Sequence, residues 1–372
     1  MDRLNASTLS ATSSGSNKSP GLCLQNIPQA CARLCLQVEK TLQRLDLKRP
    51  LRLLLALSGG ADSTALALIF ALLAPRRKDT LFAASVNHGL RSEAKAEVAG
   101  TQALCRQLGI AFKSVCLDVR GWARQQKMGL EEAARKLRYA FLEEERLAHG
   151  ADYIVTAHHA DDLTEDILMR LVRGSGWPAL GGMCDLDPQR HLLRPLLGLK
   201  KRALTDMLHA LDLTWFEDAS NQDLHFTRNR FRQTLVPLLE KENPNLAVTF
   251  GHLHTLADYD ADFWRIYLTE ALDRFGYDIQ LNSQKTQVQI TFSKALLTYL
   301  HPAARLRLYR YALQGIASLR QDQGHASPEA CASQFFALED CVAQGQGGKT
   351  ILFPGSVRVL FQKRSLHFYA AL

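Results

Sequence analysis

Residues 53–63 read LLLALSGGADS, and a second apolar run, TALALIFALLA, follows directly. The first run has the length of a buried strand and the second the length of a helix. The polar loop between them, residues 58–63, would point backbone N–H groups outward beside a helix N-terminus, which carries a partial positive charge. Glycines at 59 and 60 would let the backbone approach an anion closely and adopt positive φ. The stretch therefore predicts a phosphate-binding loop between a strand and a helix.

The composition is that of a globular protein with an anionic partner. The chain has 372 residues, of which 47% are hydrophobic and 22% charged, and a formal net charge of +8. The length predicts two domains, and the charge is compatible with a nucleic-acid or nucleotide partner or with a generally basic surface. None of the eight cysteines forms a CxxC pair, which argues against a cysteine-held metal and favours a reducing compartment. Residues 53–74 are long enough for a membrane helix, but glycines and Asp62 interrupt them, so we interpret them as strand, loop and helix.

Strands and helices alternate along the first two thirds of the chain. This rhythm predicts an α/β fold, a Rossmann-like parallel sheet covered by helices, whose ligands bind at the carboxyl ends of the strands. From about residue 240 the pattern changes to a mostly helical part with a hairpin over 278–292 and a strand pair around Pro354. We expect a disordered tail over 1–26, in which a transit peptide is the less favoured alternative, a catalytic domain over 27–240 and a substrate domain over 241–372. The expected strands are 52–58, 80–88, 112–119 and 152–159, and the expected helices are 27–46, 63–74, 92–109, 130–150, 161–174, 246–276 and 303–317.

Five motifs occur in a fixed order: SGGADS (58–63), VNHGLR (86–91), EEAARKLRY (131–139), TAHHADD with Glu165 (156–165) and RGSG (173–176). The first resembles the pyrophosphate loop of N-type ATP pyrophosphatases. Together with RPLL (194–197), DASN (218–221) and RNRFR (228–232), the set resembles the tRNA(Ile)-lysidine synthase family. The resemblance covers roughly residues 50–240 and is weaker beyond.

The resemblance implies a two-step reaction on the first anticodon base, a cytidine, of tRNA(Ile) with a CAU anticodon. ATP adenylates the base and releases pyrophosphate, and the lysine ε-amine then displaces AMP from C2 to form lysidine. The implied ATP loop is Ser58, Gly59, Gly60, Ala61, Asp62 and Ser63, and Asp62 would hold Mg²⁺ together with the phosphates. By the same resemblance we expect a cytoplasmic enzyme, and a homodimer by analogy alone.

The chemistry of lysine transfer can be matched to further residues. A lysine ammonium needs carboxylates to hold it and a base to take its proton; Asp162 and Glu165 share a helix face, and His158 is the expected base. Arg135, with Arg138, would stabilise charge on the α-phosphate. The alternatives remain that the acids only complement the helix dipole, that these arginines pair with Glu131 and Glu132, and that HHxDD is a metal site. The expected tRNA-binding residues are Arg173, Arg228, Asn229 and Arg232.

Two further basic or aromatic features have alternative interpretations. Arg305, Arg307 and Arg310 form a partial stripe that would bind tRNA or simply be a solvated helix face. Trp177 would stack on the target base or pack in a core. The rival function is tRNA 2-thiolation, which needs paired or persulfide cysteines that have no matching context in this sequence.

Overall fold

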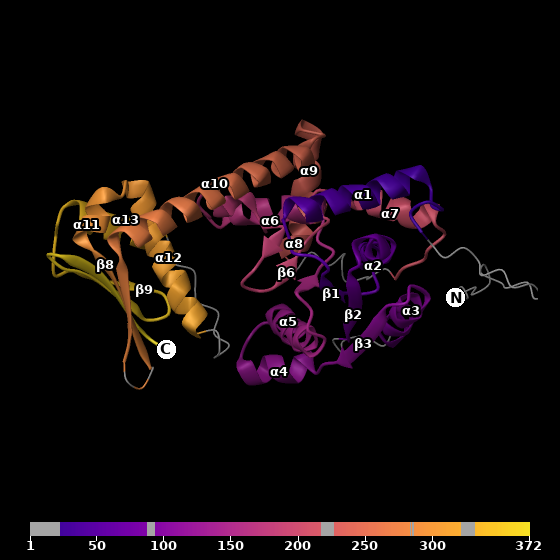
Figure 1. Cartoon of the computed structure of the whole chain (residues 1–372), viewed down its shortest axis with the longest axis horizontal. Helices are drawn as coiled ribbons and strands as arrows, with labels where there is room; N and C mark the ends of the chain where they lie inside the picture. The colour runs from indigo at the N-terminus through magenta and orange to yellow at the C-terminus, as the bar shows by residue number, and fades with distance from the viewer. Residues whose placement is uncertain (1–22, 88–93, 217–226, 283, 285, 321–331) are drawn as a thin grey trace, which may run out of the picture. The chain divides into compact units, whose positions relative to one another are not determined.

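The computed structural model describes residues 23–87, 94–216, 227–282, 284, 286–320 and 332–372 (Figure 1). The chain divides into two compact units. The first comprises Met1–Met169 and Met183–Gly251, and the second comprises Arg170–Gly182 and His252–Leu372. Most of the tail expected over 1–26, residues 88–91 of VNHGLR and the DASN motif lie outside the described residues.

The first unit contains a six-stranded sheet in the order β3-β2-β1-β4-β6-β5. Every neighbouring pair is parallel except β5 and β6. The α/β prediction is therefore confirmed. The strands are β1 (Arg52–Ala56), β2 (Thr80–Asn87), β3 (Ala111–Cys116), β4 (Tyr153–Val155), β5 (Leu186–Asp187) and β6 (Leu192–Leu193).

Helices follow most of these strands, as the alternation predicted. Short helices such as α4 were not foreseen; in α4 the Asp118 side chain caps the N-terminus by accepting a hydrogen bond from Gly121 N at 2.9 Å. The helices are α1 (Gln29–Arg44), α2 (Ala61–Arg77), α3 (Ala94–Gln107), α4 (Val119–Gln126), α5 (Leu130–Ala148), α6 (Ala160–Val172), α7 (Lys201–Ala210), α8 (Thr227–Arg230) and α9 (Val236–Glu242), with one π-turn, η3 (Phe231–Leu235).

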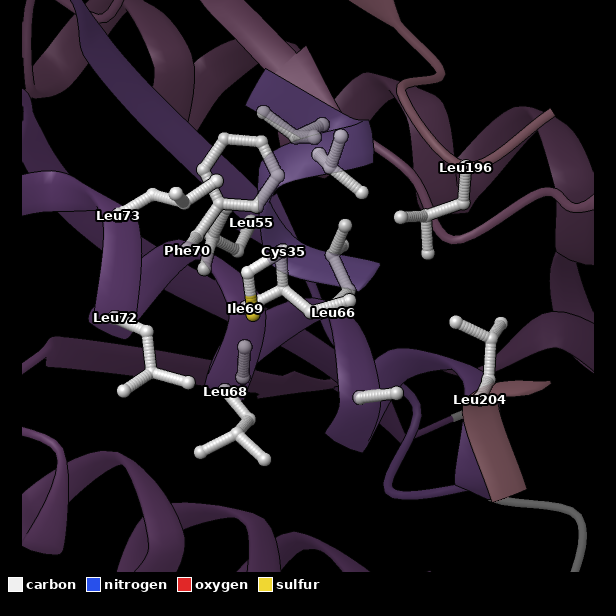
Figure 2. Close-up of a cluster of buried hydrophobic side chains, with 14 of the residues drawn as sticks. Cys35, Leu55, Leu66, Leu68, Ile69, Phe70, Leu72, Leu73, Leu196 and Leu204 are labelled. Atoms are coloured by element: carbon white, nitrogen blue, oxygen red, sulfur yellow. The ribbon is translucent and has the colours of Figure 1, made fainter. Parts of the chain in front are cut away.

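The central strand β1 is buried on both faces, which explains its continuous run of leucines. Leu53 and Leu55 pack into the cluster that α2 dominates, and Leu54 points to the opposite face, where it meets Phe141 of α5. Figure 2 shows the first cluster, in which Leu55 lies beside Phe70 of α2. α2 is apolar on every side because it is buried along nearly its whole length. None of the helices within the described residues is long and apolar enough to cross a membrane, and residues 53–74 form a strand, a loop and a helix.

The second unit combines helices with a five-stranded antiparallel sheet in the order β7-β8-β11-β10-β9. The expected hairpin and the strand pair around Pro354 are both present, and β11 joins them into one sheet. The helix α10 (Leu246–Phe275) runs from the first unit into the second. The other elements are η1 (Ala179–Gly181), β7 (Tyr277–Leu281), β8 (Gln287–Ser293), α11 (Lys294–Tyr299), α12 (Pro302–Arg320), α13 (Ala332–Ala343), β9 (Thr350–Phe353), β10 (Val357–Phe361) and β11 (Ser365–Ala371).

The arginines of α12 are used inside this unit. Arg305 forms an ion pair with Glu339 of α13, which also accepts a hydrogen bond from the Tyr309 hydroxyl at 3.0 Å. The Arg307 guanidinium lies 4.2 Å from the ring centroid of Trp264, and Arg310 lies 5.3 Å from that of Phe335. The three side chains therefore hold elements of the second unit together, and neither an open basic stripe nor a solvated helix face describes them.

The buried face of α2 sets the stability of the first unit. Leu66 is fully buried in this cluster, so we expect Leu66→Ala to lower the free energy of unfolding by about 2–5 kcal/mol through lost burial and a residual cavity. The matched control is Leu147→Ala, because the Leu147 side chain on α5 is 64% exposed. Urea denaturation of both variants checks this, and equal midpoints would contradict the packing described here.

Candidate functional site

The site lies where the strand order of the sheet reverses, between β1 and β4. After β1 the chain crosses to β2 on one side, whereas β4 pairs with β1 on the other side, with Leu54 opposite Ile154. Such a switch point opens a crevice at the carboxyl ends of the strands. The loop after β1 and the loop after β4 therefore lie next to each other, although about a hundred residues separate them in the sequence.

The loop after β1 is organised around the Ser63 hydroxyl. This hydroxyl accepts hydrogen bonds from the amides of Ser58 and Gly59, at 3.2 and 3.1 Å, and donates to the Gly60 carbonyl at 3.0 Å. Gly60 is the N-cap of α2 and has no side chain to satisfy the first amides of the helix. The first intrahelical bond of this turn runs from Thr64 N to Gly60 O. The amides of Ala61, Asp62 and Ser63 precede it and suit an anion.

The two glycines of the loop differ in conformation. Gly59 has a φ of +84°, and a Cβ there would lie 2.9 Å from the Thr101 hydroxyl. Gly60 has a φ of −77°, and its Cβ would approach no atom closer than 3.7 Å. Positive φ was expected at both positions, and for Gly60 that expectation is wrong. Only Gly59 requires glycine for its backbone, because L side chains strongly disfavour its conformation.

His159 connects the two loops. Its Nε2 lies 3.6 Å from Asp62 Oδ2 of the first loop and 3.4 Å from Asp162 Oδ2, and its Nδ1 lies 3.2 Å from Asp161 Oδ2. The ring is 2% exposed. Burial by itself would lower the pKa of His159, but the contacts with Asp161, Asp62 and Asp162 outweigh burial and raise this pKa to about 9. His159 is thus an imidazolium at neutral pH, surrounded by three carboxylates.

Asp162 and Glu165 lie on the buried face of α6, and two arginines bind both of them. Arg228 donates to Asp162 Oδ1 at 2.8 Å and to Glu165 Oε2 at 2.7 Å. Arg232 donates to Glu165 Oε1 at 2.5 Å and to Asp162 Oδ1 at 3.1 Å. The expectation that the two acids share a helix face is confirmed. Arg228 and Arg232, expected on a tRNA-binding surface, instead direct their guanidinium groups at these acids.

His158 lies in a positive environment. Its Nδ1 is 2.8 Å from the Thr156 hydroxyl, so Nε2 is the nitrogen left for other partners. Burial, the largest cause, and the positive charges of Arg194, Arg228 and Arg138 together lower the pKa of His158 to about 3, against the opposing effect of Asp162. The imidazole is neutral at physiological pH and is a weak proton acceptor in this state. Arg138 was expected in the site together with Arg135, whereas Arg194 had no predicted role, although the motif RPLL contains it.

The remaining predicted residues take different positions. Arg135 is exposed on α5, with its guanidinium 5.1 Å from the ring centroid of Tyr139. Asn229 is buried on α8. Arg173 is exposed in the second unit, and in that unit Trp177 donates its indole N–H to Asp260. Glu132 pairs with Lys136 at 3.0 Å.

Asp62 has the properties of a cation ligand. Its Oδ1 is buried, and within the described part of the chain it has no hydrogen-bond partner. A carboxylate oxygen next to an anion-binding loop suits Mg²⁺, which is commonly held by one or two carboxylates together with substrate phosphates. The residues present therefore fit a nucleotide-bound magnesium ion, with Asp62 as the protein ligand.

Comparison with known proteins agrees with this geometry. The family described as the PP-loop domain matches residues 34–239. A tRNA(Ile)-lysidine synthase of Nitratidesulfovibrio vulgaris is 40% identical over 309 residues, which cover 81% of this chain and 86% of that protein. Another, from Geobacter sulfurreducens, is 40% identical over 225 residues, 60% of this chain but only 47% of that longer relative. A solved U34-tRNA thiolase from Methanococcus maripaludis has a TM-score of 0.52 at 18% identity, covers 62% of this chain and 80% of its own, and shows the shared fold.

The two loop glycines provide a test of the phosphate loop. We expect Gly59→Ala to lower the free energy of unfolding by about 1–3 kcal/mol, because φ is positive and the new Cβ meets Thr101. It should also weaken binding of inorganic pyrophosphate by at least tenfold. Gly60→Ala is the matched control and should change stability by less than about 0.5 kcal/mol. Urea denaturation and calorimetric titration measure both effects, and equal losses at the two positions would refute the distinction.

The raised pKa of His159 predicts a pH dependence of stability. Its pKa in the folded protein, about 9, exceeds the unfolded value of about 6.5. The protonated His159 side chain therefore stabilises the folded protein by an amount on the order of 3 kcal/mol. This stabilisation is complete below pH 6.5 and is lost as the pH rises through 9. His159→Gln should remove this pH-dependent component. Urea denaturation at pH 6, 7.5 and 9 measures it, and parallel profiles for the two proteins would contradict the assignment.

Proposed function

The chain belongs to the tRNA(Ile)-lysidine synthase family of PP-loop proteins, and we propose that it joins lysine to C2 of the first anticodon cytidine of tRNA(Ile) with a CAU anticodon. The enzyme is a carbon–nitrogen ligase that uses ATP and releases AMP and pyrophosphate. The observation that carries this proposal is the position of the phosphate loop beside the acids of α6, joined through His159. An ATP bound to the loop would have its α-phosphate close to groups that can hold an ammonium.

In the first step the base oxygen O2 attacks the α-phosphorus, and pyrophosphate leaves. The loop amides 61–63 and the N-terminus of α2 would hold the β- and γ-phosphates. Mg²⁺, with Asp62 as its protein ligand, would neutralise phosphate charge when ATP is bound. Arg135 and Arg138 on α5 are the proposed partners of the α-phosphate. Negative charge that develops there would be stabilised by guanidinium groups already fixed in the site.

In the second step the lysine ε-nitrogen attacks C2, and AMP leaves with the original base oxygen. Asp162 and Glu165 would hold the ammonium, and it must lose a proton before attack. His158 is the proposed acceptor of this proton. Its pKa is about 3 because of burial and of the nearby arginines, and an anionic adenylate among these arginines would raise the pKa toward a useful value.

We propose that the second unit, with Arg173 and Trp177, contributes to tRNA binding. The basic composition of the chain and the exposure of Arg173 support this role of the second unit. Backbone contacts from Arg and Lys would make the affinity salt-dependent. Cytoplasmic location and a homodimer stay predictions that rest on the family resemblance.

Thiolation of tRNA is the weaker alternative. The solved thiolase that shares this fold is described with a [4Fe-4S] cluster, which requires cysteine ligands. This chain has no CxxC pair. The lysine pathway instead needs paired carboxylates, and the site contains them.

The direct test combines the protein with ATP, Mg²⁺, radiolabelled lysine and a tRNA with a CAU anticodon. Label should enter the tRNA as AMP and pyrophosphate are released. We expect Asp62→Ala to abolish pyrophosphate release, whereas Asp162→Ala retains part of the adenylation but loses lysine transfer by at least a hundredfold.

The matched control is Asp206→Ala, because the Asp206 side chain on α7 is 67% exposed and lies 3.7 Å from Arg202. It should leave both partial reactions unchanged. Incorporation of sulfide in place of lysine would overturn the proposed function. Equal loss of both partial reactions in Asp62→Ala and Asp162→Ala would refute the division of roles between the two acids.

A further inference from the structure

The proposed lysine-binding acids are already occupied by the protein's own cations. Asp162 and Glu165 have side chains that are 12% and 2% exposed, and Arg228 and Arg232 each bind both of them. Glu165 Oε2 accepts from Arg228 at 2.7 Å and from Arg232 at 3.1 Å. We name these four side chains the arginine clamp. A lysine ammonium needs the same oxygens that the clamp uses.

Charge counting shows why the clamp and a lysine compete. Two carboxylates face two guanidiniums, so the clamp is neutral without a ligand. An added ammonium would give the site one uncompensated positive charge, and such charges are costly in a poorly solvated environment. Buried acids cannot be left without partners either, so an arginine can leave only as another cation arrives.

Further arginines lie near the clamp. Arg138 lies close enough to Arg135 and Arg228 for their repulsion, after its own burial, to lower the pKa of its guanidinium. Arg194 is buried, with one guanidinium nitrogen donating to the Cys184 carbonyl at 2.8 Å. These arginines are also among the groups that keep His158 neutral. A cationic ligand therefore enters an environment that repels it unless an anion arrives as well.

The arginine side chains of the clamp are partly exposed. The side chains of Arg228 and Arg232 are 33% and 34% exposed, in contrast to the acids beneath them. They are four residues apart on α8 and η3, and so lie on the same side of the turn. A planar guanidinium binds a phosphate through two parallel N–H groups, with a geometry very similar to that of its pair with a carboxylate. A phosphate is thus a suitable alternative partner for both arginines.

We infer that the arginine clamp makes lysine binding depend on a bound phosphate group, which takes Arg228 and Arg232 from Asp162 and Glu165 as the lysine ammonium replaces them. The inference rests on the proposed function, because lysine is the ligand whose order of binding it specifies. Arg228 and Arg232 are then positioning residues that prevent lysine from binding to the two acids until the substrate to be modified is present. The phosphate comes either from the tRNA backbone or from the nucleotide.

The test is the affinity of the full chain for radiolabelled lysine, measured by equilibrium dialysis in four conditions. These are protein alone, protein with inorganic phosphate, protein with a non-hydrolysable ATP analogue and Mg²⁺, and protein with the CAU tRNA but no ATP. Without phosphate, we take less than about a tenth of the protein to have Asp162 and Glu165 released from the arginines. The affinity for lysine should then rise by at least tenfold when phosphate opens the clamp. If the lysine affinity rises only with the tRNA, the phosphate belongs to the RNA. If it rises only with the ATP analogue, the phosphate belongs to the nucleotide. Equal affinity in all four conditions overturns the inference.

Two variants separate gating from a structural role. Arg232→Lys keeps the charge but loses the two-pronged contact, so lysine should bind several-fold more tightly without phosphate and gain less from it. Arg230→Gln is the control on the same helix, since Arg230 donates to Thr227; its lysine affinities should match the wild type. If Arg232→Lys lowers lysine affinity by the same factor in every condition, the arginine is a structural support and the inference fails.

The test of the arginine clamp can be distinguished from the test of the proposed function. If the wild type incorporates lysine into tRNA but binds free lysine equally well in all conditions, the enzyme assignment holds and the clamp does not gate. If no condition gives lysine binding or incorporation, the proposed function fails, and the clamp fails with it. Thermal denaturation of Arg232→Lys confirms that the variant is folded before its affinities are compared.

Discussion

The structure depends on the parallel pairing of β1 with β4. This pairing forms the switch point of the sheet and brings two sequence-distant loops to the same edge. His159 then links them as a buried imidazolium between Asp62 and Asp162. His159 thereby connects the loop after β1 with the acids of α6. Nucleotide chemistry and amine chemistry can share one edge of the sheet because this cation holds the acids in place.

The balance of charge decides what the site can accept. Asp162 and Glu165 are neutralised by Arg228 and Arg232, while Arg138 and Arg194 lie among them with no acid of their own in the clamp. The site without ligands is therefore better suited to a phosphate than to an ammonium. This order agrees with a reaction in which the base is adenylated before the amine attacks. The same charges keep His158 neutral, so the proton transfer that we propose for it would depend on an anion in the site.

The second unit uses its basic and aromatic side chains differently. Arg305 is in an ion pair with Glu339, and Arg307 covers the ring of Trp264. A row of arginines on a helix is therefore not enough to predict a nucleic-acid surface. Each guanidinium here has an acid or an aromatic ring beside it, and the sequence spacing does not reveal that partner.

Local patterns in the sequence determined the elements of the first unit. Leucine runs, loop glycines and helical periodicity predicted β1, α2 and the alternation of strands and helices along the chain, because nearby residues determine strand burial and helix amphipathicity. The motifs also indicated the phosphate loop and the acid pair at positions 162 and 165. The short helix α4 escaped prediction, since eight residues carry too little periodic signal.

Only the tertiary structure decided which charges meet. His158 was expected to act in the site, yet its neighbour His159 is the one that contacts three carboxylates. Arg228 and Arg232 were expected to face RNA, and they bind the acids of α6, more than sixty residues away in the sequence. Such pairings arise from strand order and helix packing, which join distant segments, and a linear pattern carries no information about the partner across the sheet. The sequence by itself therefore determined the residue types of the site, and the fold determined their partners and their charge states.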